Sequence, residues 1–272
     1  MPHRAFAYVK RFVVKAYEDN ITGLAAMVAY NLLLSILPLA LLALFIAGQV
    51  LGSGELERSV LSDLRRLFPD TAESTLTNLL NGLERNSTSL GIVALVTGVW
   101  FGSSFWGALD TAFCRIYHVQ CRTWIQQKRF ALVMLVVVLL FMAATVAVPT
   151  IQSLLLSSAD DLPLGLSDVD GLVFGVTLAA GLLLLFGILC LIYWAVPNQR
   201  LPWRAIWPGA AAATAAIGLV DYAFPLYLSN VSTIGSFGNT FAFIAILLVW
   251  FYVLAIIIIG GGVVNALRLS GG

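Results

Sequence analysis

The fold is constrained most by a series of long apolar segments that contain almost no charged residues. The first, residues 21–50, carries no Asp, Glu, Lys or Arg. A helix needs about 20 consecutive apolar residues to cross the hydrocarbon core of a bilayer. Only 11% of the residues are charged, whereas soluble domains average about 25%. The segments are continuously apolar and do not alternate at every second residue, which disfavours a transmembrane β-barrel. The sequence therefore predicts an all-α membrane protein.

Five further segments of this kind follow, so we predict six transmembrane helices in one membrane domain covering residues 1–272. The predicted spans are about 21–50, 90–113, 130–156, 171–196, 205–228 and 237–267. The polar segment 55–89 has leucines at helical spacing on both sides of Pro69. This pattern predicts two short amphipathic helices in the loop after the first span.

The first twenty residues are basic and amphipathic. Phe6, Val9, Val13 and Tyr17 recur at spacings of three and four, which predicts a helix that lies on the membrane surface. The basic residues are followed by an apolar span much longer than that of a secretory signal peptide, so we expect no cleaved signal.

Charged residues divide unequally between the two sides that six spans create. The side with both termini holds eleven of the 15 basic residues, whereas the other side holds ten of the 14 acidic residues. Because basic loops stay in the cytoplasm, both termini are predicted to be cytoplasmic. A basic residue near an anionic lipid surface contributes about 1 kcal/mol to membrane binding. Five arginines on this side are candidates for contacts with lipid head groups: Arg115, Arg122, Arg129, Arg200 and Arg204.

Polar residues inside the spans carry most of the functional information. Asn31, Ser35 and Pro38 share one face of the first span, since offsets of four and seven residues return to the same side of a helix. A proline inside a helix also removes one backbone hydrogen bond. We expect this face to contact protein, either as polar contacts between helices or as part of a substrate path.

Asp110 and Asp221 are the two acidic residues inside predicted spans. A charge at such a depth costs at least about 2.5–3.5 kcal/mol, so each should face the interior, be protonated or have a partner. Asp110 shares a face with Ser103, Gly107 and Cys114, and it lies near enough to the basic loop to pair with Arg115 or another base there. The candidates for a substrate path are Asn31, Ser35, Pro38, Asp110 and Asp221.

No pattern predicts a metal site or a cofactor. The three cysteines and two histidines do not have the spacing of zinc ligands or of a disulfide framework. Gly260, Gly261 and Gly262 lack the Lys and Ser/Thr that a phosphate loop requires. These glycines are instead expected to allow close packing of another helix.

Several motifs occur in order along nearly the whole chain. Residues 29–38 read Ala-Tyr-Asn-Leu-Leu-Leu-Ser-Ile-Leu-Pro. The other pieces are Trp124 to Ala131, Tyr193 to Pro197, Pro208 to Ala210, Tyr227 to Gly238, Leu248 to Tyr252 and the glycine-rich end of the last span. The ordered set resembles the YihY/BrkB family, once described as ribonuclease BN. This chain has Ile234 where many members have Tyr, and Gly262 where they tend to have Ala. The resemblance implies a six-helix protein of the bacterial cytoplasmic membrane, with lipid transport among the activities proposed for it.

The sequence is compatible with three functions. The first is movement of a lipid or another amphiphile across or within the bilayer, with membrane lipids as the partners. The second is a membrane scaffold that transports nothing, and the third is an ion-coupled exporter or channel. A nuclease would need metal-binding carboxylates or a His pair facing cytoplasmic RNA, and most of the acids are on the other side, so we expect neither an enzyme nor a nucleic-acid partner. Small-residue faces suit a homo-oligomer as well as internal packing, so the oligomeric state is left open.

Overall fold

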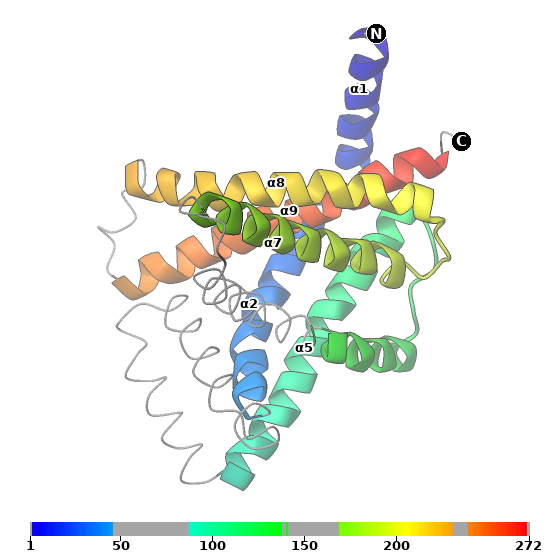
Figure 1. The fold of residues 1–272 in the computed structure, drawn as a ribbon. Coiled ribbons are helices and arrows are strands. Elements are labelled where there is room, and N and C mark those ends of the chain that lie inside the picture. The colour runs from blue at the N-terminus through cyan, green and yellow to red at the C-terminus, as the bar shows by residue number, and fades with distance from the viewer. Residues whose placement is uncertain (1, 46–86, 138–139, 141–168, 231–238, 271–272) are drawn as a thin grey trace.

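The computed structural model describes residues 2–45, 87–137, 140, 169–230 and 239–270, and all regular secondary structure in these ranges is helical (Figure 1). The helices are α1 (Pro2–Glu18), α2 (Ile21–Phe45), α5 (Ser87–Tyr117), an unlabelled helix at 124–137, α7 (Val169–Ala195), α8 (Trp203–Asn230) and α9 (Asn239–Ser270). The predicted all-α class is therefore confirmed for the described part of the chain.

Helix bounds agree with most of the predicted spans. The helix that begins the third span starts at 124, six residues earlier than predicted, and is described to 137. The rest of that span and the amphipathic helices expected within 55–89 lie largely outside the described residues. Two described helical windows are long and apolar enough to cross a membrane, Leu178–Ala195 and Ala245–Leu269, and Ile21–Ser35 is a shorter apolar stretch.

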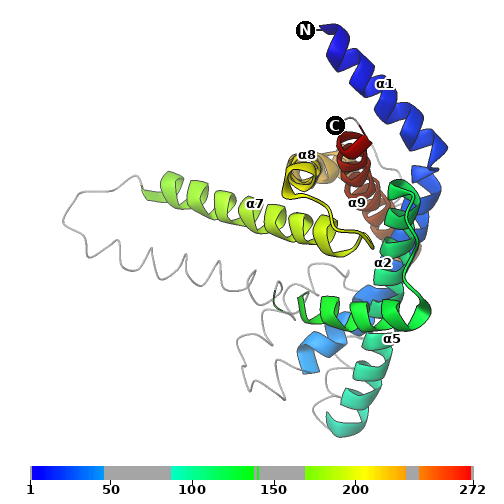
Figure 2. The same ribbon diagram turned by 90° about the vertical axis from the view of Figure 1, so that its right-hand side faces the viewer.

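Helix α9 is the centre of the described fold. It packs against α2, α8, α5 and α1, while α2 also runs along α5 and α7 packs on α8 (Figures 1 and 2). Phe113 from α5 and Tyr193 from α7 are fully buried. Their rings meet edge to face with centroids 5.8 Å apart, a favourable aromatic geometry.

Helix α1 projects from the rest of the molecule, with its end held in place beside α5 (Figures 1 and 2). Its predicted apolar stripe of Phe6, Val9, Val13 and Tyr17 is exposed. The helix packs inward through a neighbouring side, since Phe12 lies against the core. An apolar face that protein does not cover is what a helix lying on a membrane surface requires.

The turn between α1 and α2 is formed by Asp19 and Asn20. Asn20 has a φ of 53°, in the left-handed region that Asn tolerates better than most residues. Its side-chain oxygen accepts a hydrogen bond from the Gly23 backbone N–H at 3.4 Å, as a helix N-cap does. The buried Asp19 pairs with Lys15 at 2.9 Å and lies 3.6 Å from His118 at the end of α5. These contacts fix the direction in which α1 leaves the fold.

The basic segments meet at one end of the molecule. The end of α5, the turn after α7, the start of α8 and the end of α9 all lie toward the right of Figure 1. The Asn198 amide donates to the Gln120 carbonyl at 3.0 Å and joins two of these loops. We call this region the basic end.

Candidate functional site

The most strongly connected polar residues form a junction around Asp110 at the basic end. Asp110 is fully buried on α5. Its carboxylate accepts one hydrogen bond from the Arg122 guanidinium at 2.5 Å and another from the Arg122 backbone N–H at 3.3 Å. The sequence indicated that Asp110 needs a basic partner from the loop. In the structure that partner is Arg122.

Arg122 also holds the end of α7. Its guanidinium donates to the carbonyls of Ala195, at 2.9 Å, and Val196. These carbonyls lie at the C-terminus of a helix, where backbone acceptors lack partners and a cation is favourable. The guanidinium also stacks on Phe130, 4.1 Å from the ring centroid. One side chain thus joins α5, α7 and the helix at 124–137.

The helix at 124–137 docks on the small-residue face of α5. Lys128 donates to the Ser103 hydroxyl at 2.5 Å and lies 5.0 Å from the centre of the Trp100 ring. The Gln127 amide donates to the Gly107 carbonyl at 3.3 Å, and a Cβ on Gly107 would crowd that amide. The face predicted from Ser103, Gly107 and Asp110 is therefore a helix-packing surface.

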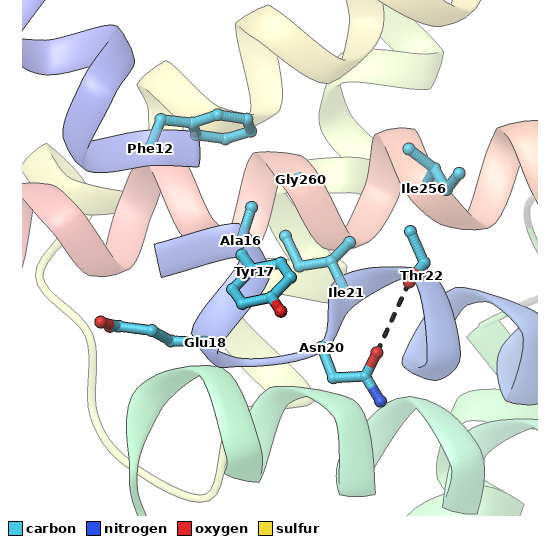
Figure 3. Close-up of a pocket in the computed structure, with 9 residues that line it drawn as sticks. All are labelled: Phe12, Ala16, Tyr17, Glu18, Asn20, Ile21, Thr22, Ile256 and Gly260. Atoms are coloured by element: carbon cyan, nitrogen blue, oxygen red, sulfur yellow. Dashed lines mark hydrogen bonds between the residues drawn. The ribbon is translucent and has the colours of Figure 1, made fainter. Parts of the chain in front are cut away.

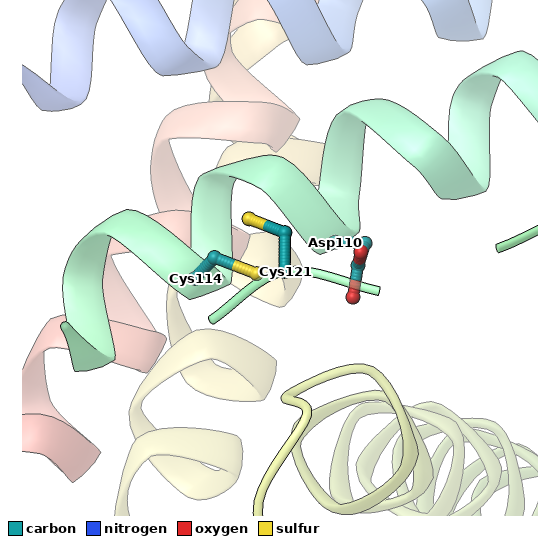
Figure 4. Close-up of side chains that lie close together, drawn as sticks. All are labelled: Asp110, Cys114 and Cys121. Carbon is teal, nitrogen blue, oxygen red and sulfur yellow. The ribbon is translucent and has the colours of Figure 1, made fainter. Parts of the chain in front are cut away.

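Asp110, Cys114 and Cys121 form a group that could be considered for a metal (Figure 4). One carboxylate oxygen and the two sulfur atoms lie within 4.8 Å of one another. The carboxylate, however, is already neutralised by Arg122 at 2.5 Å. A cation at this position would meet the guanidinium charge, so the residues fit a structural ion pair better than a metal site.

The polar residues of the first span are used in packing. Ser35 is buried, and its hydroxyl lies 2.6 Å from the carbonyl of Asn31 and 2.7 Å from the carbonyl of Phe101 on α5. Asn31 turns back on its own helix and donates to the Met27 carbonyl at 2.8 Å. Helix α2 continues through Pro38, which is partly buried.

Asp221 lies apart from these residues. It is exposed on α8, and within the described part of the chain it has no hydrogen bond or ion pair. The structure therefore brings Ser35 close to α5 and Asp110 into the junction, but it does not bring Asn31, Asp110 and Asp221 together around a common interior.

Helices α8 and α9 cross with almost no side chains between them. A Cβ on Gly209 would overlap the Gly261 carbonyl oxygen, and a Cβ on Gly261 would overlap the Tyr193 hydroxyl. A Cβ on Gly262 would lie 2.5 Å from Phe113. The buried Asn265 side-chain oxygen accepts a hydrogen bond from the Gly209 backbone N–H at 2.8 Å. The expectation of close helix packing is confirmed for Gly261 and Gly262, whereas a Cβ on Gly260 would meet only Phe12 among the described residues, at 3.8 Å.

A cleft of about 630 Å³ opens where α1 meets α2 beside α9 (Figure 3). We call it the elbow cleft. Its lining is amphiphilic, with apolar side chains together with the polar groups of the turn between α1 and α2. The lining residues are Phe12, Ala16, Tyr17, Glu18, Asn20, Ile21, Thr22, Ile256 and Gly260. Both its volume and its mixed lining are within the range of small-molecule sites.

A second cleft, of about 590 Å³, lies at the basic end between α1, α8 and α9. We call it the arginine cleft. Three arginines from three helices line it, Arg11, Arg204 and Arg268. Arg11 and Arg268 were not among the residues singled out from the sequence. They are 257 positions apart along the chain, and only their common location on the basic side hinted at a shared site.

The five arginines predicted to contact head groups are placed differently from one another. Arg115, Arg129, Arg200 and Arg204 are exposed, and Arg204 lines the arginine cleft. Arg122 instead turns into the protein, where its side chain is 14% exposed. The physical reason is the buried carboxylate of Asp110, because a buried charge without a partner costs a large free energy of desolvation.

Comparison with known proteins places the chain among membrane proteins of one family. The family model described as virulence factor BrkB matches residues 12–269. A UPF0761 membrane protein of Delftia acidovorans is 27% identical over 264 residues, which cover 92% of this chain and 59% of that protein. The ribonuclease-like protein YfkH of Bacillus subtilis is 26% identical over 89% of this chain and 88% of its own length. A UPF0761 membrane protein of Alteromonas mediterranea is 26% identical over 92% of this chain and 83% of that protein.

The chain spans about three fifths of the length of the Delftia relative. No solved structure matches it significantly. Because the family model covers nearly the whole sequence, in agreement with the motifs at 29–38 and at the end of α9, the chain belongs to the BrkB family of membrane proteins.

Proposed function

We propose that this protein moves a lipid or another amphiphilic molecule across or within the bilayer, as a multi-pass protein of the bacterial cytoplasmic membrane with both termini in the cytoplasm. One observation supports this more than any other. The elbow cleft of about 630 Å³ opens beside the amphipathic helix α1, whose apolar stripe is exposed.

The lining of the elbow cleft suits a molecule with a polar and an apolar end. Ile21 and Ile256 form an apolar wall. Asn20 offers an amide, Thr22 a hydroxyl and Glu18 a carboxylate. An amphiphile whose head lies at the turn and whose tail follows α9 would satisfy both parts of the lining. The basic end would attract anionic head groups in addition.

The test is reconstitution into liposomes with fluorescent phospholipids, in which a membrane-impermeant quencher reports lipid that has changed leaflet. Wild-type protein is expected to move lipid faster than empty liposomes. Gly260→Leu is expected to slow this movement, because Gly260 lines the elbow cleft and a Cβ there has room, with Phe12 at 3.8 Å. The matched control is Gly187→Leu on α7, where a Cβ would meet no described atom within 4 Å. Movement no faster than in empty liposomes would refute the proposal.

The scaffold is the second candidate, and a specific observation favours it. The polar residues Ser35, Asp110 and Asn265 form hydrogen bonds that join helices, which is how a protein without a transport path would use them. A scaffold predicts no lipid movement in the liposome assay and equal rates for Gly260→Leu and wild type. The third candidate, an ion-coupled exporter, relied on Asp221, whose exposed position on α8 gives it no support.

We propose no enzymatic activity for this chain. The ribonuclease-like name belongs to the Bacillus relative, and a hydrolytic site needs a free carboxylate or base at an open position. Of the two buried acids in the described chain, Asp110 is paired with Arg122 and Asp19 with Lys15. Incubation of the purified protein with RNA in the presence of Mg²⁺ or Mn²⁺ is expected to leave the RNA intact, and metal-dependent cleavage that copurifies with the protein would contradict this.

A further inference from the structure

The arginine cleft has the features of an anion site. Arg11 comes from the middle of α1, Arg204 from the first turn of α8, and Arg268 from the last turn of α9. All three side chains are exposed, and none forms an ion pair in the described part of the chain. Among the described residues that line the cleft, none is acidic. Three like charges around one hollow repel one another unless a negative charge lies among them.

Arginine and the helix terminus both favour a phosphate. The guanidinium group presents a planar fork of N–H donors that matches two phosphate oxygens at once. Pro202, Arg204 and Ala205 bring the start of α8 to the cleft, and the N-terminus of a helix carries a partial positive charge that favours anions. The Ala205 N–H is used by the Pro202 carbonyl at 2.9 Å, so the arginines would supply most of the donors.

Aromatic side chains beside the cleft point to a lipid as the source of that phosphate. Trp203 and Trp207 are exposed on the same first turns of α8, and Arg268 lies 5.9 Å from the Trp207 ring. Tyr8 lines the cleft and is also partly exposed. Exposed Trp and Tyr rings are typical of the depth at which lipid head groups lie. The uncovered apolar stripe of α1, which includes Val9, would bring the same region to that depth.

We infer that the arginine cleft binds the phosphate of an anionic phospholipid head group, held by Arg11, Arg204 and Arg268. The site joins α1 to the ends of α8 and α9, so a bound lipid would fix the position of α1 on the fold. This inference goes beyond the proposed function, since the cleft is separate from the elbow cleft and a lipid can bind there whether or not the protein moves lipid.

The test measures binding and not transport. Protein purified in detergent is exchanged into nanodiscs of phosphatidylcholine with increasing phosphatidylglycerol, and retained lipid is counted by native mass spectrometry after mild delipidation. The wild type is expected to retain phosphatidylglycerol in preference to phosphatidylcholine. Each of Arg11→Gln, Arg204→Gln and Arg268→Gln should weaken retention about fivefold, and the triple variant about 100-fold.

A charge-matched control separates this cleft from the general charge of the basic end. Arg115, Arg129 and Arg200 are also exposed, but they do not line the cleft. The triple variant Arg115→Gln/Arg129→Gln/Arg200→Gln removes the same charge and should keep most of the preference. Equal loss in both triple variants, or no loss in the cleft variant, would overturn the inference.

Two further measurements complete the test. In the first, inorganic phosphate or glycerol phosphate is added at up to millimolar concentration as a competitor. If either displaces phosphatidylglycerol when the competitor and the lipid are equal in concentration, the cleft binds a soluble phosphate and the lipid assignment is overturned. Size-exclusion profiles check that each variant is folded. If the triple variant aggregates, the single Arg204→Gln decides, since Arg204 is exposed and has no ion pair in the described chain to lose.

Discussion

Helices α7 and α9 have nearly the same kind of sequence but opposite surroundings. Both contain long apolar windows, yet 39% of the residues in the α9 window are buried against 17% in the α7 window. Helix α9 crosses α8 at Gly209 and Gly261 with almost no space between the backbones. On α7, a Cβ added at Gly181 or Gly187 would meet no atom of the described residues within 4 Å. Apolar composition therefore indicates that a helix belongs in a membrane, but not whether protein or lipid covers it.

The two helices also differ in how they are attached. Helix α7 is fixed at its C-terminal end, where Tyr193 donates to the Ile258 carbonyl at 2.8 Å and Arg122 binds the last carbonyls. Farther from that end, Leu178 and Leu183 are exposed. Helix α9, by contrast, packs against α2, α8, α5 and α1. We therefore expect perturbations at the basic end to release α7 before they affect α9.

The largest effect is expected from breaking the buried ion pair at the end of α7. Asp110→Ala leaves the Arg122 guanidinium without its carboxylate, and loss of one member of a buried pair costs about 3–5 kcal/mol of unfolding free energy. Hydrogen exchange should show lost protection at the end of α7 and retained protection in α9. The measurement is unfolding in mixed micelles, followed by exchange mass spectrometry.

Two companion variants keep this prediction decisive. Arg129→Ala removes an exposed arginine of the same region and should change the unfolding free energy by less than about 0.5 kcal/mol. The double variant Asp110→Leu/Arg122→Met replaces the pair by apolar groups and should recover part of the lost stability. Equal stability of Asp110→Ala and wild type, or equal loss of protection in both helices, would remove the proposed difference in attachment.

An intermediate effect is expected from adding a methyl group to matched glycines. Gly209→Ala and Gly261→Ala must separate α8 from α9 or displace Tyr193, and such overpacking costs about 1–3 kcal/mol. Gly181→Ala and Gly187→Ala would meet no described atom, so they should be neutral or stabilise by about 0.5–1 kcal/mol, because Ala favours the helix. Thermal unfolding of the four variants in one detergent provides the comparison, and similar shifts at all four sites would contradict it.

The smallest effect is expected at Asp221. Asp221 is exposed on α8 and pairs with no described group, so Asp221→Asn removes no contact and introduces no charge at this depth. The variant should therefore not lose unfolding free energy, in contrast to Asp110→Ala. Lipid movement in liposomes should also be unchanged, with or without a proton gradient. A large loss of stability, or a gradient-dependent loss of transport, would show that Asp221 has a partner or a coupling role.

The sequence was sufficient for the helices and for some packing contacts. Runs of apolar residues located α2, α5, α7, α8 and α9 to within a few residues. They could do so because the hydropathy signal is summed over many consecutive residues of a segment. The close approach at Gly261 followed from the absence of a side chain. The need of Asp110 for a basic partner in the loop followed from the cost of an unpaired buried charge.

The sites that join distant segments could not be predicted in the same way. Arg122 was expected at the lipid surface, because the sequence does not state which arginine of the loop reaches the buried carboxylate. Arg11, Arg204 and Arg268 meet only because α1 leaves the fold at one angle, which is set by the left-handed Asn20 and the contacts of Asp19. Such angles depend on tertiary packing and have no local signature.

The glycine crossing has a mechanical consequence for any conformational cycle of this protein. With backbone against backbone at Gly209 and Gly261, and Asn265 bonded across the contact, there is no layer of side chains on which α8 and α9 could slide. The two helices are expected to move as a rigid body. Among the described helices, the candidate hinges are then the elbow between α1 and α2 and the turn between α7 and α8. A crosslink from α8 to α9 should be harmless, whereas one from α1 to α9 should hold the elbow in one position.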